Sequence, residues 1–367
     1  MSQPPRVLRV LIVDDSATVR AHLRKALNAD HGFTIVGEAV DGESAIALCR
    51  SLRPDVVTLD MVLPRGSGLF ATEQIMAHHP TPILIVSSSA NRGELFDTYE
   101  ALAAGAVDIL EKPLGDEPDE AHDADSWSAR YRAAVRMVAR IRVITHPRAL
   151  MRDRLPSAPP AAPPPAPSPA IREATSPPAR VIGIGASTGG PAALRTVLSQ
   201  LPPTFPLPIL VVVHLASGFD SALADWLATA MPFPISVATD GMALPRLGVV
   251  LAPPDRHLVL QGDRLRLLNA PPLHSCRPSV DHLFGSMAEL GPRAVGVLLT
   301  GMGKDGAAGL LAMRRQGALT IAQDEATSTV YGMPREAHAL GAAVHVLPLD
   351  RIAAMIATTT PTPEGQR

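Results

Sequence analysis

A stretch dominated by proline and alanine, between about Pro156 and Pro178, is the feature that most limits how this chain folds. Proline lacks a backbone N–H and has a fixed φ angle, so such a stretch forms neither a regular helix nor a strand. It favours extended, semi-rigid conformations, which is typical of a linker between domains. A length of 367 residues also exceeds one ordinary core of about 100 to 200 residues, and we therefore predict two domains.

Short apolar runs alternate with helical patterns on both sides of this stretch. Before it, strand-like runs cover residues 7–13, 34–39, 56–59, 83–87 and 107–110, with helical patterns at 17–27 and 42–52. After it, strand-like runs cover residues 181–185, 209–214, 248–252, 294–300, 319–323 and 344–347, with helical patterns at 191–201, 221–230 and 307–316. Runs with no polar face are typical of parallel sheets covered by helices on both sides. Both halves are predicted to be doubly wound α/β domains.

One further amphipathic helix is predicted between Trp127 and Ile141, where apolar residues recur at steps of three and four. Arg132, Arg136 and Arg140 line another side of it. Such a basic stripe is compatible with nucleic-acid binding, but a solvated face or a docking surface is the commoner explanation, and we favour it.

Composition narrows the class of protein. Hydrophobic residues make up 46% of the chain and charged residues 19%, which is enough for two buried cores. A net charge of −2 provides no general attraction to nucleic acid or to an anionic membrane, and the run Val10–Val13 is too short to cross a membrane. Cys49 and Cys276 lack the paired spacing of a zinc site or a disulfide framework. We expect a cytoplasmic protein that neither binds nucleic acid nor inserts into a membrane.

Polar residues follow the strands of the first half at their carboxyl ends, where ligands gather in open parallel sheets. Asp14 and Asp15 follow the first strand, Asp60 the third, Ser87 ends the fourth and Lys112 follows the fifth. Clustered carboxylates bind Mg²⁺, and a carboxylate beside Mg²⁺ and an ammonium can accept a phosphoryl group. Each residue alone has an ordinary explanation as a cap, a turn former or a surface charge. Their joint placement predicts a phosphoryl-acceptor site.

Residues 1 to about 146 resemble response-regulator receiver domains in the motifs LIVDDS, TLDMVLPRGSGL, IVSSS and EKP. The resemblance implies a flavodoxin-like sheet, phosphorylation of Asp60 by a CheA-type histidine kinase, and supporting roles for the hydroxyl and ammonium described above. It also implies Mg²⁺ bound by Asp14, Asp15, Asp60 itself and the backbone carbonyl of Met61. Ser67 stands where the family often has an aspartate, which affects the loop rather than the phosphorylation chemistry.

The segment VIGIGASTGGPAAL is predicted to form a strand, a glycine turn and a helix. Such a turn either holds the phosphate of a dinucleotide or presents Ser187 as a nucleophile beside amides that stabilise an oxyanion. Dinucleotide binding needs a glycine where Thr188 stands and an acid where the next strand ends in His214. The sequence therefore favours a hydrolase.

Asp305 completes a candidate catalytic set. It lies in LTGMGKDG, between a third strand and a helix, at the same predicted edge of the sheet as Ser187 and His214. Alone, the histidine would more often be a core residue and the aspartate a helix cap. Together the three residues provide a nucleophile, a general base and an orienting carboxylate.

Residues from about 179 to 357 resemble the catalytic domain of CheB-type chemotaxis protein-glutamate methylesterases. The motifs IGASTGG, CRPSVD, LTGMGKDGAAG and TIAQDEATSTVYGMPREA carry the likeness. It implies Ser187 as nucleophile, His214 as base and Asp305 as its partner, with Thr188 and Met302 shaping the site. The implied substrates are methylated glutamates of chemoreceptors, which release methanol, and receptor glutamines, which are deamidated. No cofactor is implied for the hydrolysis.

Two departures from that family concern the surroundings of the base. This chain reads VHLA around His214 where QHMP is common, and Cys276 stands where a histidine often precedes RPSVD. Arg277 and Asp281 within that motif are either a structural ion pair or a substrate-binding pair, and the sequence alone does not separate the two.

The predicted organisation is a receiver domain at 1–146, a linker at 147–178, a methylesterase domain at 179–358 and a frayed tail at 359–367. We expect phosphorylation of the receiver to activate the esterase. The alternative is a response regulator whose output domain only binds DNA or a signalling protein, but no basic helix-turn-helix is apparent after the linker. A nucleotide-dependent oxidoreductase is disfavoured by the missing ribose-binding acid.

Overall fold

The computed structural model describes residues 6–88, 92–112, 126–141, 143, 179–215 and 219–360. The chain forms two compact units, one from its N-terminal and one from its C-terminal part, and each is described by itself. The predicted linker at 147–178 lies outside the described residues, as does most of the predicted tail.

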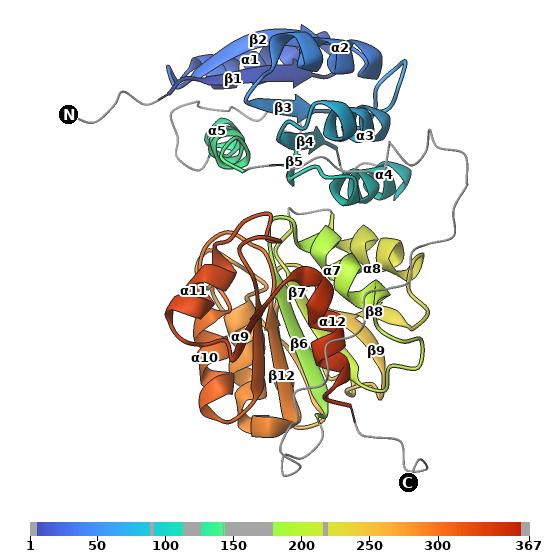
Figure 1. The fold of residues 1–367 in the computed structure, drawn as a ribbon, viewed down its shortest axis with the longest axis vertical. Coiled ribbons are helices and arrows are strands. Elements are labelled where there is room, and N and C mark those ends of the chain that lie inside the picture. Colours follow the sequence, from blue (N-terminus) through green and yellow to red (C-terminus); the bar gives the residue numbers. More distant parts are fainter. Residues whose placement is uncertain are drawn as a thin grey trace, which may run out of the picture. The chain divides into compact units, whose positions relative to one another are not determined.

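The N-terminal unit is built on a five-stranded parallel sheet with the order β2-β1-β3-β4-β5 (Figure 1). The strands are β1 (Leu8–Val13), β2 (Phe33–Ala39), β3 (Val56–Leu59), β4 (Ile83–Ser87) and β5 (Asp108–Glu111). The apolar runs of β1, β3 and β4 are buried, as expected for strands covered on both faces. The doubly wound parallel sheet predicted from the sequence is confirmed.

Five helices cover this sheet in the described residues. α1 (Ala17–Asn28) packs beside α5 (Trp127–Val138), and α2 (Gly42–Leu52), α3 (Gly68–His78) and α4 (Arg92–Ala103) form a second row (Figure 1). The sequence pattern did not predict α3 and α4. The serine at the unusual loop position, Ser67, accepts a hydrogen bond from the Phe70 amide at 3.2 Å and so caps the start of α3.

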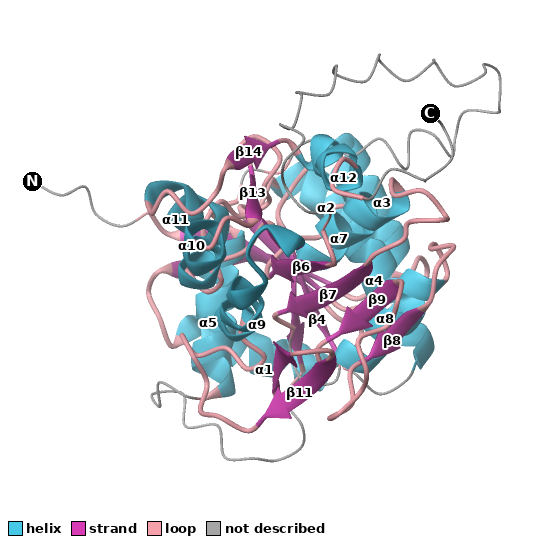
Figure 2. Cartoon of the chain, turned by 90° about the horizontal axis from the view of Figure 1, so that it is seen from below, coloured by secondary structure: helices cyan, strands magenta, loops and turns pink. Residues whose placement is uncertain are grey.

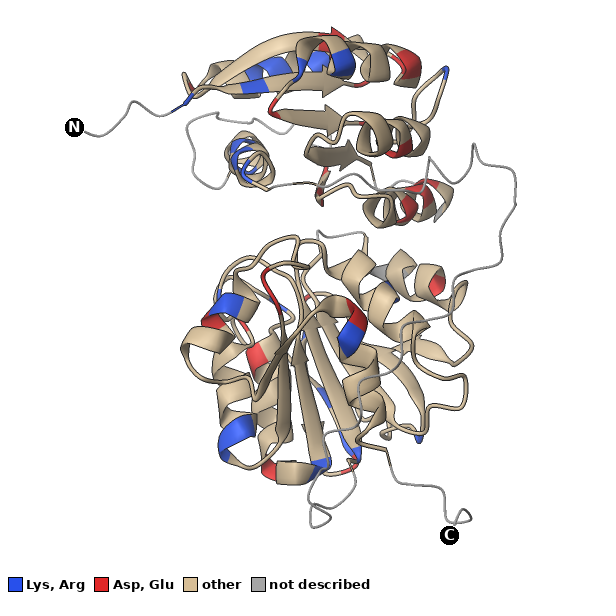
Figure 3. Ribbon diagram, in the orientation of Figure 1, with Lys and Arg blue, Asp and Glu red and all other residues tan. Residues whose placement is uncertain are grey.

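The basic residues of α5, coloured blue in Figure 3, contact other residues of the N-terminal unit. The Arg132 guanidinium donates to the carbonyl of Ala26 at 3.0 Å. Arg136 pairs with Asp30, and its guanidinium lies 4.5 Å from the centre of the Phe33 ring. Two of the three arginines thus fasten α5 to the rest of the unit, which removes the reason to assign the stripe to nucleic acid.

The C-terminal unit contains a seven-stranded parallel sheet with the order β14-β13-β12-β6-β7-β9-β8. The strands are β6 (Val181–Ala186), β7 (Pro208–Val213), β8 (Ile235–Val237), β9 (Gly248–Leu251), β12 (Ala294–Leu298), β13 (Leu319–Gln323) and β14 (His345–Leu347). A separate antiparallel hairpin pairs β10 (His257–Gln261) with β11 (Arg264–Leu268). Figure 2 shows β6, β7, β9 and β8 side by side. This unit too is doubly wound, as predicted, while β8 and the hairpin were not predicted.

Helices lie on both faces of this larger sheet (Figure 1). On one side are α7 (Gly190–Ser199), α8 (Asp220–Ala228) and α12 (Leu349–Ala357). On the other are α9 (Val280–Met287), α10 (Ala307–Arg315) and α11 (Met333–Ala339), with a 3₁₀ segment at Ala288–Arg293. Of these, the sequence pattern predicted only α7, α8 and α10.

A glycine of β6 allows α9 to lie close to the sheet. A Cβ atom added to Gly185 would overlap the side chain of Val280, at the start of α9. The absence of a side chain therefore lets residues 279–281 approach the edge of the sheet where the candidate site lies.

None of the helices in the described part of the chain combines the length and the apolarity needed to cross a membrane.

Candidate active site

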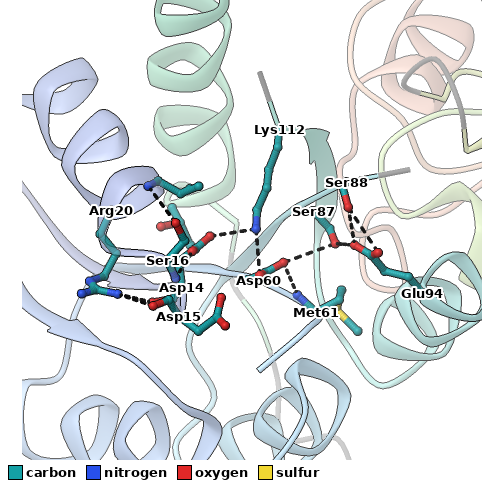
Figure 4. Close-up of polar contacts among 12 residues, drawn as sticks. Asp14, Asp15, Ser16, Arg20, Asp60, Met61, Ser87, Ser88, Glu94 and Lys112 are labelled. Carbon is teal, nitrogen blue, oxygen red and sulfur yellow. Dashed lines mark hydrogen bonds and ion pairs between the residues drawn. The ribbon is translucent and has the colours of Figure 1, made fainter. Parts of the chain in front are cut away.

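The first candidate site lies at the carboxyl edge of the N-terminal sheet (Figure 4). Asp14 and Asp15 follow β1, and Asp60 follows the adjacent strand β3. The Asp60 amide donates to the Val13 carbonyl at 2.9 Å, which holds the ends of β3 and β1 together. One oxygen from each of the three carboxylates lies within 4.8 Å of the others. Asp14 and Asp60 are buried and Asp15 is exposed. The structure thus brings together the three carboxylates that the sequence predicted.

Lys112 joins two of these carboxylates. Its ammonium lies 2.9 Å from Asp14 Oδ2 and 2.7 Å from Asp60 Oδ2 (Figure 4). Burial raises the pKa of the Asp60 carboxyl, and Lys112 opposes that rise. Burial also acts to lower the pKa of Lys112, but the two carboxylates outweigh it and raise that pKa. The ammonium therefore stays charged beside the candidate phosphoryl acceptor.

The unbalanced carboxylate oxygens fit a hard dication. Asp14 Oδ2 is buried, and its partner among the described residues is the ammonium of Lys112, which it shares with Asp60. Three carboxylates against one ammonium leave negative charge that Mg²⁺ would offset through oxygen ligands. The carbonyl of Met61 accepts a hydrogen bond from the Gly68 amide at 3.1 Å and keeps a second lone pair for such an ion.

Ser87 lies beside Asp60 and reaches a residue that the sequence analysis missed. Its hydroxyl lies 3.4 Å from Asp60 Oδ1 and 2.5 Å from Glu94 Oε1, and the Ser88 hydroxyl also contacts Glu94 (Figure 4). Glu94 is buried in the first turn of α4. The only sequence signal for this contact was an acidic residue early in a helix. Acidic residues are common there because they interact favourably with the helix dipole.

The second candidate site lies at the carboxyl edge of the C-terminal sheet, across three neighbouring strands. Ser187 follows β6, His214 follows β7 and Asp305 lies in the loop between β12 and α10. His214 Nε2 lies 2.9 Å from Asp305 Oδ2. The Ser187 amide donates to the Thr300 carbonyl and the His214 amide to the Ala186 carbonyl, both at 3.0 Å, so the backbone binds the three strand ends together.

Asp305 is held by a set of hydrogen bonds from the start of α9. The Ser279 hydroxyl donates to Oδ1 at 2.7 Å, the Val280 amide to Oδ2 at 2.7 Å and the Asp281 amide to Oδ1 at 3.1 Å. Burial acts to raise the pKa of Asp305, but the bonds to His214, Ser279 and Val280 outweigh it and lower the pKa. A fixed, anionic carboxylate therefore faces the imidazole. No local pattern in the sequence marks Ser279 for this role.

Ser187 stands beside this pair without bonding to it. Its side chain is partly exposed, and no hydrogen bond joins its hydroxyl to His214 within the described residues. The remaining imidazole nitrogen, Nδ1, lies 3.6 Å from Cys276 Sγ. Catalytic hydrogen bonds are often long before substrate binds, so the geometry is compatible with a triad. The structure joins His214 to Asp305, places Ser187 at the end of the neighbouring strand and adds Cys276 as a neighbour of His214.

The turn after Ser187 presents a helix N-terminus to the reacting group. α7 begins after Gly189, whose φ of 74° lies in the left-handed region that glycine adopts at no steric cost. No side chain of the described residues caps this helix end. The Gly190 amide donates to the Ser187 carbonyl at 2.6 Å, Pro191 has no N–H and the Ala193 amide donates to the Gly189 carbonyl at 3.2 Å, so α7 offers the reacting group the positive end of its dipole rather than a row of free amides.

Gly301, in the loop after β12, packs directly against Ser187. A Cβ atom added there would lie 2.7 Å from Ser187 Cβ, so only glycine allows this approach. The next residue, Met302, is 58% exposed, and Thr188 is buried with its carbonyl accepting from the Thr300 hydroxyl at 3.0 Å. The two supporting residues predicted from the sequence therefore differ. Met302 presents an exposed apolar side chain, whereas Thr188 helps to hold the turn.

Arg277 and Asp281 do not pair with each other. Arg277 lies 3.6 Å from Asp255, and Asp281 lies 3.4 Å from His274 Nε2 and accepts from the Gly309 amide at 2.6 Å. Asp281 thus joins the start of α9 to α10. The structure supports neither a mutual ion pair nor a joint pair for substrate.

The charge state of His214 depends on its two neighbours. Burial acts to lower its pKa, but the hydrogen bonds to Asp305 and Cys276 outweigh burial and raise the pKa to about 9. At neutral pH the imidazole of the free protein is therefore mostly protonated.

Comparison with known proteins decides the family. Residues 182–356 match the CheB methylesterase family, and residues 10–122 match the response regulator receiver domain. A Geobacter metallireducens protein named protein-glutamate methylesterase/protein-glutamine glutaminase 4 is 42% identical over 353 residues, which is 94% of this chain and 97% of that protein. The chain belongs to the CheB methylesterase family.

A second relative extends over nearly the whole chain, and a solved structure covers about half of it. An Anaeromyxobacter dehalogenans protein-glutamate methylesterase/protein-glutamine glutaminase 2 is 44% identical and covers 95% of both chains. The Thermotoga maritima CheB methylesterase catalytic domain is similar at 34% identity with a TM-score of 0.47, over 49% of this chain and 98% of that one. Membership of the CheB family confirms the receiver-plus-methylesterase fold and the hydrolase class that the sequence predicted, and disfavours a non-catalytic output domain.

Proposed function

We propose that this CheB-family chain hydrolyses glutamyl methyl esters of chemoreceptors, releasing methanol, and deamidates receptor glutamines, under the control of phosphorylation at Asp60. The observation that carries the proposal is the hydrogen-bonded pair of His214 and Asp305 beside Ser187, on three neighbouring strand ends. The names of the relatives, methylesterase and glutaminase, support the same substrate class.

In the proposed reaction, Ser187 Oγ attacks the γ-carbonyl carbon of the ester while His214 takes the hydroxyl proton. Nδ1 receives that proton, because Nε2 is committed to Asp305. The positive end of the α7 dipole stabilises the oxyanion of the tetrahedral intermediate. Collapse expels the methoxy group, which takes the proton from the imidazolium and leaves as methanol. Water then attacks the glutamyl-serine ester by the same steps and frees the carboxylate.

The same residues suffice for deamidation. With a glutamine side chain, the leaving group is an amine that takes the proton from His214 and departs as ammonia. The acyl intermediate and its hydrolysis are unchanged. The proposal therefore assigns both activities to one site without a cofactor.

The test is to incubate the full chain with receptor fragments methylated at glutamate, and separately with fragments that retain the encoded glutamine. Methanol should appear in step with new glutamate in the first case, and ammonia in the second. An enzyme-free sample and a heat-inactivated sample supply the controls. Absence of both products under phosphorylating conditions would refute the proposal.

We propose Asp60 as the phosphorylation site of the receiver, with a CheA-type histidine kinase as phosphodonor. When bound, Mg²⁺ supplies charge neutralisation for the phosphoryl oxygens, and Asp14, Asp15, Asp60 and the Met61 carbonyl would hold it. Lys112 would offset the charge of the phosphoryl group from the other side. Ser87 would supply a hydroxyl to it in place of its contact with Glu94.

Phosphorylation should stimulate the wild-type chain but not the Asp60→Asn variant. Couplings between sites are commonly worth about 1–3 kcal/mol, so we expect about 5- to 150-fold stimulation of methanol release by acetyl phosphate with Mg²⁺. Each protein is compared with its own rate without donor, and chelating Mg²⁺ is the matched control. Equal stimulation of both proteins would exclude Asp60 as the site.

Hydrolysis should depend on pH through the His214 imidazole. Because the neutral ring is the base and its pKa is raised to about 9, kcat/KM should rise about tenfold per pH unit through neutral pH and level off near that value. Cys276→Ala removes one of the two contacts that raise the pKa, so the rise should move to lower pH. Superimposable pH profiles, after subtraction of spontaneous ester hydrolysis, would contradict this.

The remaining proposals concern organisation. We propose domain boundaries at 1–146, 147–178, 179–358 and 359–367, and a cytoplasmic location, where receptor tails and the kinase are accessible.

A further inference from the structure

We propose that His214 and Cys276 form a binding site for a soft divalent cation of the Zn²⁺ type, and that the bound ion switches the hydrolase off. The site uses His214 Nδ1 and Cys276 Sγ, which lie 3.6 Å apart, with Asp305 on the far side of the imidazole. One ligand atom from each of the three residues lies within 4.8 Å of the others. Cys276 takes part in no bond-making or proton-transfer step of the proposed hydrolysis.

The distance between the two ligand atoms suits tetrahedral zinc. Zn–N bonds are about 2.05 Å long and Zn–S bonds about 2.3 Å, so two such ligands at a tetrahedral angle lie about 3.6 Å apart. The separation of Nδ1 and Sγ, 3.6 Å, is the same. The two ligand atoms therefore already stand at the separation that a tetrahedral cation requires.

The second nitrogen of the ring is already placed as in zinc proteins. Histidines that bind zinc usually donate their other N–H to a carboxylate, which fixes the ring and makes it a better ligand. Here Nε2 lies 2.9 Å from Asp305 Oδ2. Both oxygens of Asp305 also accept hydrogen bonds from Ser279, Val280 or Asp281, so this carboxylate orients the ring rather than binding the ion itself.

The loop of Cys276 holds the sulfur at this position. The backbones of Leu273 and Cys276 exchange two hydrogen bonds, at 3.1 and 2.9 Å. Between them, His274 and Ser275 have φ angles of 53° and 63°, a left-handed pair that non-glycine residues rarely adopt unless the surrounding structure imposes it. Cys276 is only partly buried, so an ion from solvent can reach it.

Binding would block the reaction directly. Zn²⁺ displaces the protons of the Cys276 thiol and of His214 Nδ1 and takes the Nδ1 lone pair, which is the pair that accepts the Ser187 proton in the proposed function. Thiolate and imidazole select Zn²⁺, Co²⁺ or Cd²⁺ over Mg²⁺, so the ion needed by the receiver would not inhibit. With two protein ligands and water in the other positions, a chelator should reverse the effect. The inhibition rests on the proposed function, whereas the binding does not.

The binding test uses Co²⁺ with the full, reduced chain in excess Mg²⁺, which occupies the receiver carboxylates. We expect a thiolate-to-cobalt charge-transfer absorption that saturates at one equivalent and is removed by Zn²⁺ competition. Cys276→Ala should abolish the absorption. Cys49→Ala should keep it, because Cys49 is buried in the other unit against the Thr81 hydroxyl. Thermal unfolding of each variant shows that it is folded.

The activity test measures methanol release with Zn²⁺ and after addition of EDTA. Wild type and Cys49→Ala should lose at least about tenfold in rate and recover, while Cys276→Ala should need at least about tenfold more Zn²⁺ for the same loss. No absorption in wild type, or the same absorption in Cys276→Ala, would overturn the site. The absorption does not depend on turnover, so its presence in a chain without esterase activity would refute the proposed function and leave the metal site standing.

Discussion

Replacing Ser187 by alanine should reduce methanol release by at least about a thousandfold while the protein stays folded. The acyl intermediate cannot form without the hydroxyl, and the other members of a triad contribute little once the nucleophile is gone. The Ser187 side chain makes no hydrogen bond with the residues that the structure describes, and its backbone contacts to Thr300 and Gly190 do not depend on the hydroxyl. The rate and the unfolding temperature are measured on the same samples.

Ser199 offers a matched control for this variant. It lies on the last turn of α7, is exposed, and donates only to the Thr196 carbonyl at 3.1 Å. Ser199→Ala should retain the wild-type rate. A Ser187→Ala protein that still released methanol near the wild-type rate would show that another residue is the nucleophile.

Changing Asp305 to asparagine should lower kcat by about ten-thousandfold and also weaken the fold. The amide no longer enforces the tautomer and charge that make His214 a base. The carboxylate also accepts hydrogen bonds from the Ser279 hydroxyl and from two amides of α9. If the NH₂ group of the asparagine faces one of these donors, that donor loses its acceptor. One such buried loss costs about 1–3 kcal/mol, which urea unfolding measures.

The control for this second variant is Asp255→Asn, at an exposed aspartate that lies 3.6 Å from Arg277. It should leave both the rate and the stability near wild type, because an exposed ion pair contributes little. Wild-type kcat in Asp305→Asn would remove this residue from the catalytic set, whatever its effect on stability.

The sequence was sufficient to predict that the candidate residues of each set follow neighbouring strand ends. Ser187, His214 and Asp305 follow three buried apolar runs, and the carboxyl ends of parallel strands meet at one edge once the sheet forms. The same reasoning placed Asp14, Asp60 and Lys112 together. These predictions succeeded because the period of the strands and the position just after each one fix where a side chain emerges.

Other parts of both sites depend on contacts that no local pattern encodes. Ser279 lies 26 residues before Asp305, and Cys276 lies 62 residues after His214, so only tertiary packing brings each pair together. Glu94 stands on a helix that the apolar pattern did not reveal. The hairpin of β10 and β11 and the short strand β8 were missed for a similar reason, because brief strands at the margin of a domain carry few residues for a pattern to act on.

The lack of a side chain at Gly185 has a consequence for how this enzyme can change. α9 rests on that bare stretch of β6, and the first residues of α9 are the ones that hold the acid of the catalytic set. A single methyl group added at the buried Gly185, where it could not touch a substrate, would displace the start of α9 and misalign Asp305. Substitutions at the exposed Met302 would meet little steric hindrance, whereas any side chain at Gly185 would overlap Val280.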